Sequence, residues 1–217
     1  MTPKKGIDIL MRRLGNRKDP KLREAILDEM NVVANSLERR PFLPWFLEKT
    51  AEDLILPEGA HSLTLPEDFL VEMEDDSVFL LKDNIVHSAP TKVDRQDLKK
   101  MYPQQSATMP RYYALFGNKF LFGNPSDKEY TVHLTYLAGS RVIETSEDED
   151  EYRWLTEAGE YFITEVGAII ADTHIQNPDM AQRFAQRAAG LRTELYRLHE
   201  ARQHTNRDYS LGEGNVS

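Results

Sequence analysis

The chain contains no cysteine, and this absence excludes disulfide bonds, thiolate zinc sites and cysteine nucleophiles together. It also lacks any apolar run near the roughly 18 residues that a membrane-spanning helix needs. The basic N-terminal segment has an apolar stretch of only Ile7–Met11 and no small-residue cleavage site, so no secretory signal is predicted. We therefore expect a soluble protein, made in the cytoplasm, with no membrane partner.

Sequence motifs of catalysis are missing as well. No Gly-x-Ser-x-Gly elbow, phosphate-binding glycine loop or dinucleotide fingerprint occurs. None of the six histidines belongs to a His-Glu-x-x-His pair, and the five-residue spacing of His199 and His204 places them on different helix faces. We expect no catalytic residue, cofactor or metal, because an enzyme would have to assemble its site from scattered residues such as His87, Asp94 and Glu129.

Positive charge is in deficit, since 27 Lys and Arg residues face 36 Asp and Glu residues and give a net charge of −9. Such a deficit disfavours general affinity for nucleic acid, which depends on a basic surplus. The charge is also banded, because residues 41–81 carry 10 acidic and 1 basic group whereas residues 82–143 carry 5 and 9. Banding of this kind can provide electrostatic complementarity between partners or between copies, although ordinary solvated faces produce it too.

Helices are predicted at both ends of the chain. Asp19-Pro20 is a strong helix start, and the apolar face that follows ends near Pro41. A shorter helix around Ile7–Leu14 completes a helical hairpin. At the other end one helix opens at Tyr152 and runs to about His174, and Asn177-Pro178 starts a second. The apolar side predicted for that second helix consists of Ala181, Phe184, Ala188, Leu191, Leu195 and Leu198.

The middle of the chain is predicted to be β-rich. Short strands separated by turns are expected at Leu54–Leu56, Leu63–Leu65, Phe69–Met73 and Val78–Leu81, with a brief helix over Val93–Tyr102. Arg111–Phe116, Lys119–Phe122 and the cleanly alternating Glu129–Ala138 then predict three adjacent antiparallel strands. Trp45 and Phe46 are expected to plug the space between the helices and the sheet.

The fold class is therefore α+β, with N- and C-terminal helices forming a bundle and a central antiparallel sandwich or partial barrel. We divide the chain into an N-terminal helical hairpin (1–43), a β-rich domain (44–143), a C-terminal helical pair packed on the N-terminal helices (144–203) and a flexible polar tail (204–217).

Two residue groups allow a chemical interpretation beside a structural one. The carboxylates of Glu72–Asp76 and Glu147–Glu151 could form cation sites, but neither has calcium-loop spacing. Ser146 with Glu149 fits a capping box, so helix-dipole placement explains the second group. The aromatic residues could stack on bases of single-stranded nucleic acid, but they fit a core and subunit contacts better. They are Tyr112, Tyr113, Phe116, Phe120, Phe122, Tyr130 and Tyr136.

The order of these segments resembles the head-to-tail adaptor, or connector, proteins of tailed bacteriophages, especially the short-tailed type. The resemblance covers about Asp19 to Ala201 and rests on order, because none of its pieces is a chemical signature. The pieces are the early amphipathic helix, Pro44–Phe46, Leu54–Gly59 with Ser62–Phe69, Pro110–Gly117 with Phe120–Pro125, Tyr130–Tyr136, and the helix that begins at Tyr152.

This resemblance implies a structural virion protein and no enzyme. It implies a ring of about twelve copies, docked on the portal protein and joined below to the nozzle or tail-tube protein, in the neck of the virion. Double-stranded DNA would pass through the ring without sequence-specific binding, during assembly and during ejection. Another neck component, such as a stopper or a tail-completion protein, and a nucleic-acid-binding module remain alternatives.

Two site hypotheses follow from the resemblance and the residues together. An acidic channel lining would keep DNA sliding, and Glu147, Asp148, Glu149, Asp150 and Glu151 are its candidates, with Glu72–Asp76 as the other choice. The second hypothesis is that the C-terminal tail becomes ordered on the portal. The residues proposed for that contact are Arg202, His204, Arg207, Tyr209 and Leu211.

Overall fold

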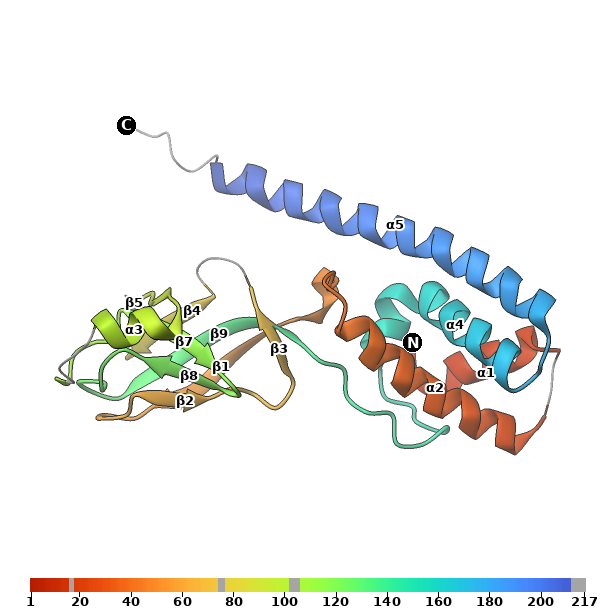
Figure 1. Ribbon diagram of the computed structural model, residues 1–217, viewed down its shortest axis with the longest axis horizontal. Coiled ribbons are helices and arrows are strands. Elements are labelled where there is room, and N and C mark those ends of the chain that lie inside the picture. The colour runs from red at the N-terminus through yellow and green to blue at the C-terminus, as the bar shows by residue number, and fades with distance from the viewer. Residues whose placement is uncertain (16–17, 74–76, 102–105, 212–217) are drawn as a thin grey trace. The chain divides into compact units, whose positions relative to one another are not determined.

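The computed structural model describes residues 1–15, 18–73, 77–101 and 106–211, with side chains up to residue 202. The chain forms two compact units, one of helices and one of strands (Figure 1). The helical unit is made of Met1–Leu47 and Ser140–Ser217, and the sheet unit is the continuous segment Glu48–Gly139. The structure is therefore α+β, as predicted, with helices at both ends and strands in the middle. The predicted β-rich segment, 44–143, is four residues longer than the sheet unit at each end.

The first two helices of the helical unit are α1 (Pro3–Arg13) and α2 (Pro20–Glu38). As predicted, Asp19 caps α2, because its side chain accepts a 2.9 Å hydrogen bond from the backbone N–H of Lys21. Pro20 fits the first position of the helix, where no backbone donor is needed. The buried face of α2 consists of Leu22, Ile26, Leu27, Met30, Val33, Ala34 and Leu37.

The other two helices of this unit are α4 (Arg153–Thr173) and α5 (Pro178–Leu211). The helix α4 is central, since α1, α2 and α5 all pack against it. Its close fit is visible at Gly167, where an added Cβ would lie 3.0 Å from Leu10 Cδ1 and 3.1 Å from a ring carbon of Phe184. The side-chain oxygen of Asn177 accepts a hydrogen bond from the N–H of Met180 and starts α5, as the sequence predicts.

Two expectations for α5 are wrong. The helix continues to Leu211, so the segment 204–217, interpreted as a flexible tail, begins as helix. Leu198 is 58% exposed, although it was assigned to the apolar side. The face that packs inward continues from Leu195 to His199, because aromatic rings of the segment before the sheet unit cover His199 and leave Leu198 in solvent.

The sheet unit is a sandwich of two sheets. The first sheet has the order β1 (Glu48–Leu56), β9 (Tyr130–Ala138), β4 (Val78–Lys82) and β5 (Ile85–Ser88), and β3 (Phe69–Glu72) also pairs with β9. The second sheet has the order β2 (Ser62–Thr64), β8 (Lys119–Phe122), β7 (Tyr112–Phe116) and β6 (Thr91–Lys92). A short helix, α3 (Arg95–Met101), packs on β7. Tyr102, the predicted last residue of that helix, lies outside the described residues.

The prediction that three consecutive strands lie side by side is wrong for the last one. β7 and β8 are paired antiparallel as expected, but β9 belongs to the other sheet and pairs with β1, β3 and β4. The chain changes sheets between β8 and β9, where Asn124 and Ser126 are buried and bond to nearby backbone. The strict alternation of β9 correctly gave its buried side, with Tyr130, Val132, Leu134 and Tyr136 inward. Alternation specifies the buried face and carries no information about the neighbouring strand.

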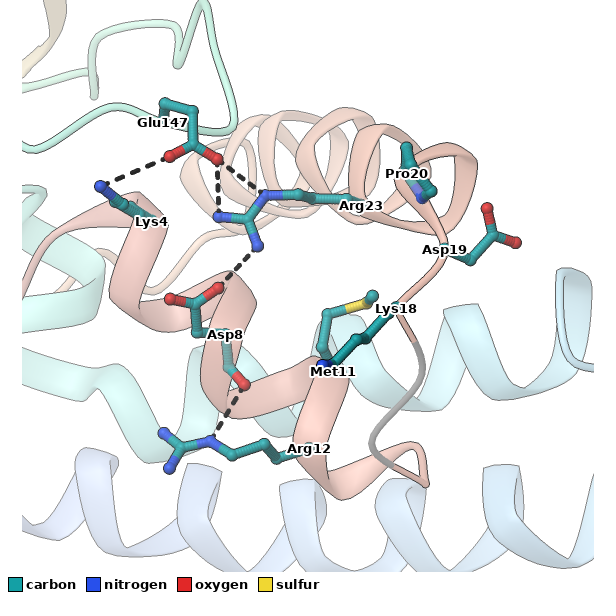
Figure 2. A pocket seen from close by; sticks show the side chains of 9 residues that line it. All are labelled: Lys4, Asp8, Met11, Arg12, Lys18, Asp19, Pro20, Arg23 and Glu147. Atoms are coloured by element: carbon teal, nitrogen blue, oxygen red, sulfur yellow. Dashed lines mark hydrogen bonds and ion pairs between the residues drawn. The ribbon is translucent and has the colours of Figure 1, made fainter.

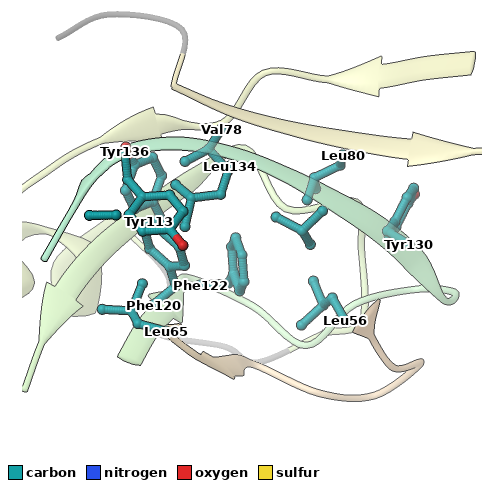
Figure 3. Packing of buried hydrophobic residues seen from close by; sticks show 12 residues of the cluster. Leu56, Leu65, Val78, Leu80, Tyr113, Phe120, Phe122, Tyr130, Leu134 and Tyr136 are labelled. Atoms are coloured by element: carbon teal, nitrogen blue, oxygen red, sulfur yellow. The ribbon is translucent and has the colours of Figure 1, made fainter. Parts of the chain in front are cut away.

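Both sheets contribute to one apolar core (Figure 3). Five of the seven aromatic residues singled out in the sequence lie in it, which confirms the core interpretation for them. Phe116 is 52% exposed instead, with the guanidinium of Arg95 3.7 Å from its ring centroid. The core consists of Leu56, Leu65, Val78, Leu80, Tyr113, Phe120, Phe122, Tyr130, Val132, Leu134, Tyr136 and Ala138.

The strand β5 was not predicted, and a tight turn creates it. Asp83 and Asn84 have φ angles of 52° and 61°, and positive φ at both central residues is the condition for a type I′ hairpin turn. Ile85 then pairs with Lys82 and Val86 with Leu81. The strand is short and exposed, so it lacks the apolar alternation by which the other strands were recognised.

Candidate functional site

The acidic run of the sequence lies in an irregular segment, Ser140–Tyr152, that links β9 to α4 and is called the strap below. Glu38, the last residue of α2, anchors its start. The backbone N–H of Ser140 donates to both carboxylate oxygens of Glu38 at 3.1 Å, and Trp154 Nε1 donates to one of them at 2.9 Å. One carboxylate thus joins α2, the start of the strap and the first turn of α4.

The middle of the strap is fixed to α2 by two further side chains. Asn31 donates from Nδ2 to the backbone oxygen of Ile143 and accepts from the backbone N–H of the same residue, both at 2.9 Å. This pair of bonds imitates the pairing of two strands. Ser146 donates its hydroxyl to Glu24 at 3.0 Å. Because Ile143 is 2% exposed, the strap is anchored by packing as well as by hydrogen bonds.

Basic residues of α1 and α2 neutralise part of the acidic run (Figure 2). Lys4 Nζ lies 2.6 Å from Glu149 and 3.4 Å from Glu147. Arg23 contacts Glu147 at 3.1 Å and Asp8 at 2.6 Å. Lys4, Asp8, Arg23 and Glu147 border an open pocket of about 810 Å³. Its lining residues are Lys4, Asp8, Met11, Arg12, Lys18, Asp19, Pro20, Arg23 and Glu147.

Arg141 binds the strap to itself. Its two terminal nitrogens contact both carboxylate oxygens of Asp148 at 2.6 and 3.0 Å, the two-point geometry that strengthens such pairs. The hydrogen bond from Arg141 holds the pKa of Asp148 below its ordinary value. The hydrogen bond from Lys4 likewise lowers the pKa of Glu149, and Glu149 in turn raises the pKa of Lys4. These carboxylates are therefore stable as anions beside their cations.

The predicted capping box at Ser146 and Glu149 is wrong. The helix α4 begins at Arg153, with Tyr152 at the N-cap position and no side-chain cap. Ser146 bonds to Glu24 instead, 122 residues away in the chain, and Glu149 bonds to Lys4. Long-range partners have replaced the local capping interaction that the spacing allowed.

The structure thus separates the five proposed channel-lining residues into two groups. Glu147, Asp148 and Glu149 are committed to Lys4, Arg23 and Arg141. Asp150 and Glu151 are exposed, and Asp150 joins the network through its backbone. In the alternative acidic group, Glu72 forms an ion pair with Lys92 and accepts a hydrogen bond from Tyr113, while residues 74–76 lie outside the described residues.

A second cluster, called the clasp below, holds α5 to the segment that precedes the sheet unit. The Phe42 ring centroid lies 4.1 Å from that of Tyr196 and 4.7 Å from that of His199. The ring centroids of Trp45 and His199 are 6.1 Å apart. The Arg202 guanidinium lies 4.4 Å from the centroid of the Trp45 ring. Burial lowers the pKa of His199, in keeping with an apolar aromatic setting.

The clasp accounts for one of the five residues proposed to contact the portal. Arg202 packs on Trp45 within the chain. His204, Arg207, Tyr209 and Leu211 follow on the helical backbone of α5, at positions where the structure describes no side chains. Trp45, which was expected to plug the space between helices and sheet, belongs to this cluster, and Phe46 packs edge-on against Trp154 in the helical unit.

The residues that bind the strap could not be identified from the sequence; they are chiefly Lys4, Arg23, Asn31 and Glu38. No local signal identifies them, because their partners lie between 102 and 145 residues away. Among the residues that the structure describes, no group of three His, Cys, Asp or Glu side chains could hold a metal ion. Within that part of the chain, no helix is both long and apolar enough to cross a membrane.

Comparison with known proteins places these features in a family. No curated protein matches the chain. The family model described as SU10 adaptor protein matches residues 7–212, which include both units and nearly the whole sequence. This match confirms the resemblance to phage adaptors that the order of segments indicated. The chain belongs to the SU10 adaptor protein family and is a structural adaptor of a bacteriophage virion.

Proposed function

We propose that this chain is the head-to-tail adaptor that docks as a ring of about twelve copies on the portal and joins it to the tail protein. In this proposal the ring surrounds the channel through which double-stranded DNA passes. The observation that carries the proposal is the family match over residues 7–212. The division into a helical unit and a sheet unit, each with its own core, supports it, because two units provide separate surfaces for two partners.

The test is native mass spectrometry of the full chain, alone and with the portal protein of the same genome. A portal complex that carries about twelve copies of the chain is the expected result. A chain that does not bind the portal at any concentration would contradict the proposal and favour a stopper or tail-completion protein.

The portal contact is assigned to the end of α5. Because Arg202 is held by Trp45, the residues available for a partner are those beyond it, including His204, Arg207, Tyr209 and Leu211. Truncation after Gln203 should abolish portal binding and leave the helical unit folded, since the last contact of the clasp is retained. A matched pair on the same helix sharpens this test. Arg207→Ala should weaken portal binding, whereas Arg183→Ala, at an exposed position near the start of α5, should not.

The channel lining is assigned to the strap. Six carboxylates lie between Glu144 and Glu151, whereas the strap network contains three basic partners, Lys4, Arg23 and Arg141. The negative excess would repel phosphates and keep DNA mobile. Reversing Asp150 and Glu151 to lysine tests this without breaking the paired carboxylates. Particles with both changes should eject DNA more slowly, and unaltered retention and ejection would contradict the assignment.

A further inference from the structure

The sheet that contains β9 has two free edges of unequal character. The strand order places β1 at one edge and β5 at the other. A free strand edge carries unpaired backbone donors and acceptors, so it can accept a strand from another chain unless charges, a bulge or a covering element prevents it. The character of each edge therefore indicates what it can bind.

The β5 edge is apolar and uncovered. Ile85 is 64% exposed and the adjacent Val86 is 57% exposed. Neighbouring residues of a strand point to opposite faces, so both faces of β5 are exposed at these two positions. β3, which flanks β9 on the same side as β4, adds Leu70 and Val71, at 37% and 39%. Four of the ten large hydrophobic side chains that are exposed in the described chain lie on these two strands.

The β1 edge is acidic and irregular. Glu48, Glu52 and Asp53 are exposed on it, and its only lysine, Lys49, is engaged by Asp68 at 2.6 Å. The pairing register with β9 shifts between Ala51 and Leu54, so a bulge interrupts the edge. Like charges oppose pairing of two β1 edges with each other. They do not oppose β5, which contains no carboxylate.

The two edges differ in charge. The strand β1 carries three carboxylates and one lysine, whereas β5 carries no carboxylate, lysine or arginine. An acidic edge therefore meets β5 without the like-charge repulsion that opposes a second β1 edge. An acidic, extended strand with one exposed apolar residue suits the β5 edge, and β1, with Ile55 44% exposed, is such a strand.

We propose that the β5 edge of one copy docks against the β1 edge of the next copy and extends the sheet from subunit to subunit. A ring requires two different surfaces on each subunit, so that the contact repeats head to tail and closes. Two unlike edges on opposite sides of one sheet satisfy that requirement, and backbone pairing between strands supplies the contact. This inference rests on the proposed ring and names one of its subunit contacts.

Cysteine cross-linking tests the contact against a clean background, because the chain has no cysteine of its own. Three variants, Ile55→Cys, Ile85→Cys and the double variant, are mixed with the portal and oxidised. Within one copy, three strand spacings, about 14 Å, separate β1 from β5, which is too far for a disulfide. We expect the double variant to give a ladder of cross-linked multimers, whereas each single variant remains monomeric on a denaturing gel. An equimolar mixture of the two single variants should give dimers only.

The control is a double variant at two exposed positions on different helices of the helical unit, Val32→Cys on α2 with Leu198→Cys on α5, which should give no ladder. A portal ring that forms with wild-type stoichiometry but yields no Ile55–Ile85 cross-link would overturn the edge contact and leave the proposed adaptor function standing. Cross-linking of Ile85→Cys alone, or of Ile55→Cys alone, would show like edges meeting and would also overturn it. Failure of the wild-type chain to bind the portal would contradict the proposed function and, with it, the ring contact.

Discussion

The single carboxylate of Glu38 accepts the hydrogen bonds that hold the start of the strap. Both of its donors, the Ser140 N–H and the Trp154 indole, would lose their acceptor in Glu38→Ala. Leaving buried donors unpaired costs more than removing both partners, and we expect a loss of about 2 kcal/mol in unfolding free energy. Urea denaturation followed by tryptophan fluorescence measures it. Glu38→Gln keeps one acceptor oxygen and should recover part of the loss; equal losses for the two variants would show that the oxygen contacts contribute little.

The pairing of Asp148 with Arg141 makes the stability of the fold depend on pH. Because the pKa of Asp148 is lowered in the folded chain, its anion contributes stability that is fully present above the unfolded pKa of about 4. That contribution is lost as the pH falls through the lower, folded pKa. Asp148→Asn should therefore lower the urea midpoint at pH 7, and the gap to wild type should close below about pH 4. Glu151→Gln, at an exposed position of the strap, is the control and should follow wild type. Parallel curves for Asp148→Asn and wild type would contradict the assignment.

Individual residues show where sequence reasoning succeeds and where it fails. Asp19 was identified as a cap because its partner, the N–H of Lys21, is two residues away. Ser146 was misassigned because its hydroxyl finds Glu24 across the fold. Contacts within one turn are encoded locally, whereas the strap network depends on which helices meet, and a single sequence does not specify that.

At the scale of elements, two leucines of α5 should affect stability very differently when they are replaced by alanine. Leu195 is 7% exposed and Leu198 is 58% exposed, three residues apart on one helix. Leu195→Ala should lower the unfolding free energy by about 2 kcal/mol or more, because it removes buried methyl groups and leaves a cavity. Leu198→Ala should stay within about 0.5 kcal/mol of wild type. Thermal or urea unfolding of the two variants measures the difference in unfolding free energy. Equal losses for both variants would contradict the described orientation of α5.

The clasp predicts a local change in the dynamics of α5. Trp45→Ala removes the indole ring that lies beside His199 and that the Arg202 guanidinium covers. We expect faster amide hydrogen exchange over residues 196–202 and unchanged exchange near Ala188, which is buried against the helical unit. Uniform acceleration along α5 would show that the clasp acts on the helix as a whole.

The elements themselves were largely predictable, and their partners were not. The described helices α1, α2, α4 and α5 follow from apolar periodicity, with correctly predicted starts at Asp19 and Asn177, and most strands follow from short apolar runs between turns. The assignment of β9 to the wrong sheet has a physical cause, because alternation specifies which side chains are buried and the chain between Phe122 and Tyr130 decides which sheet the strand joins. β5 was missed because its exposed residues carry no burial pattern.

At the scale of the whole molecule, the sheet unit is an insertion in the helical unit. Glu48 pairs with Leu137, so the two ends of the insertion lie beside each other. Among the described residues, the buried cluster that forms its core runs from Leu56 to Ala138, and Ala51 and Leu54 of the same unit pack against it. We therefore expect residues 48–139, expressed alone, to fold into a β-rich domain with a cooperative urea transition. Circular dichroism and equilibrium unfolding measure this, and a chain without a cooperative transition would show that the helices are needed for the sheets to form.

The length of α5 sets the distance along the helix between the clasp and Leu211. The 34 residues of α5 span about 51 Å. Beyond Arg202, whose guanidinium packs on the Trp45 ring, nine further residues carry the helical backbone about 13 Å onward. Because a helix converts residues into distance at a fixed rate, inserting or deleting whole turns there would change the stand-off of the terminal residues in steps of about 5.4 Å. The distance along α5 from Arg202 to Leu211 is thus set by the number of helical turns between them.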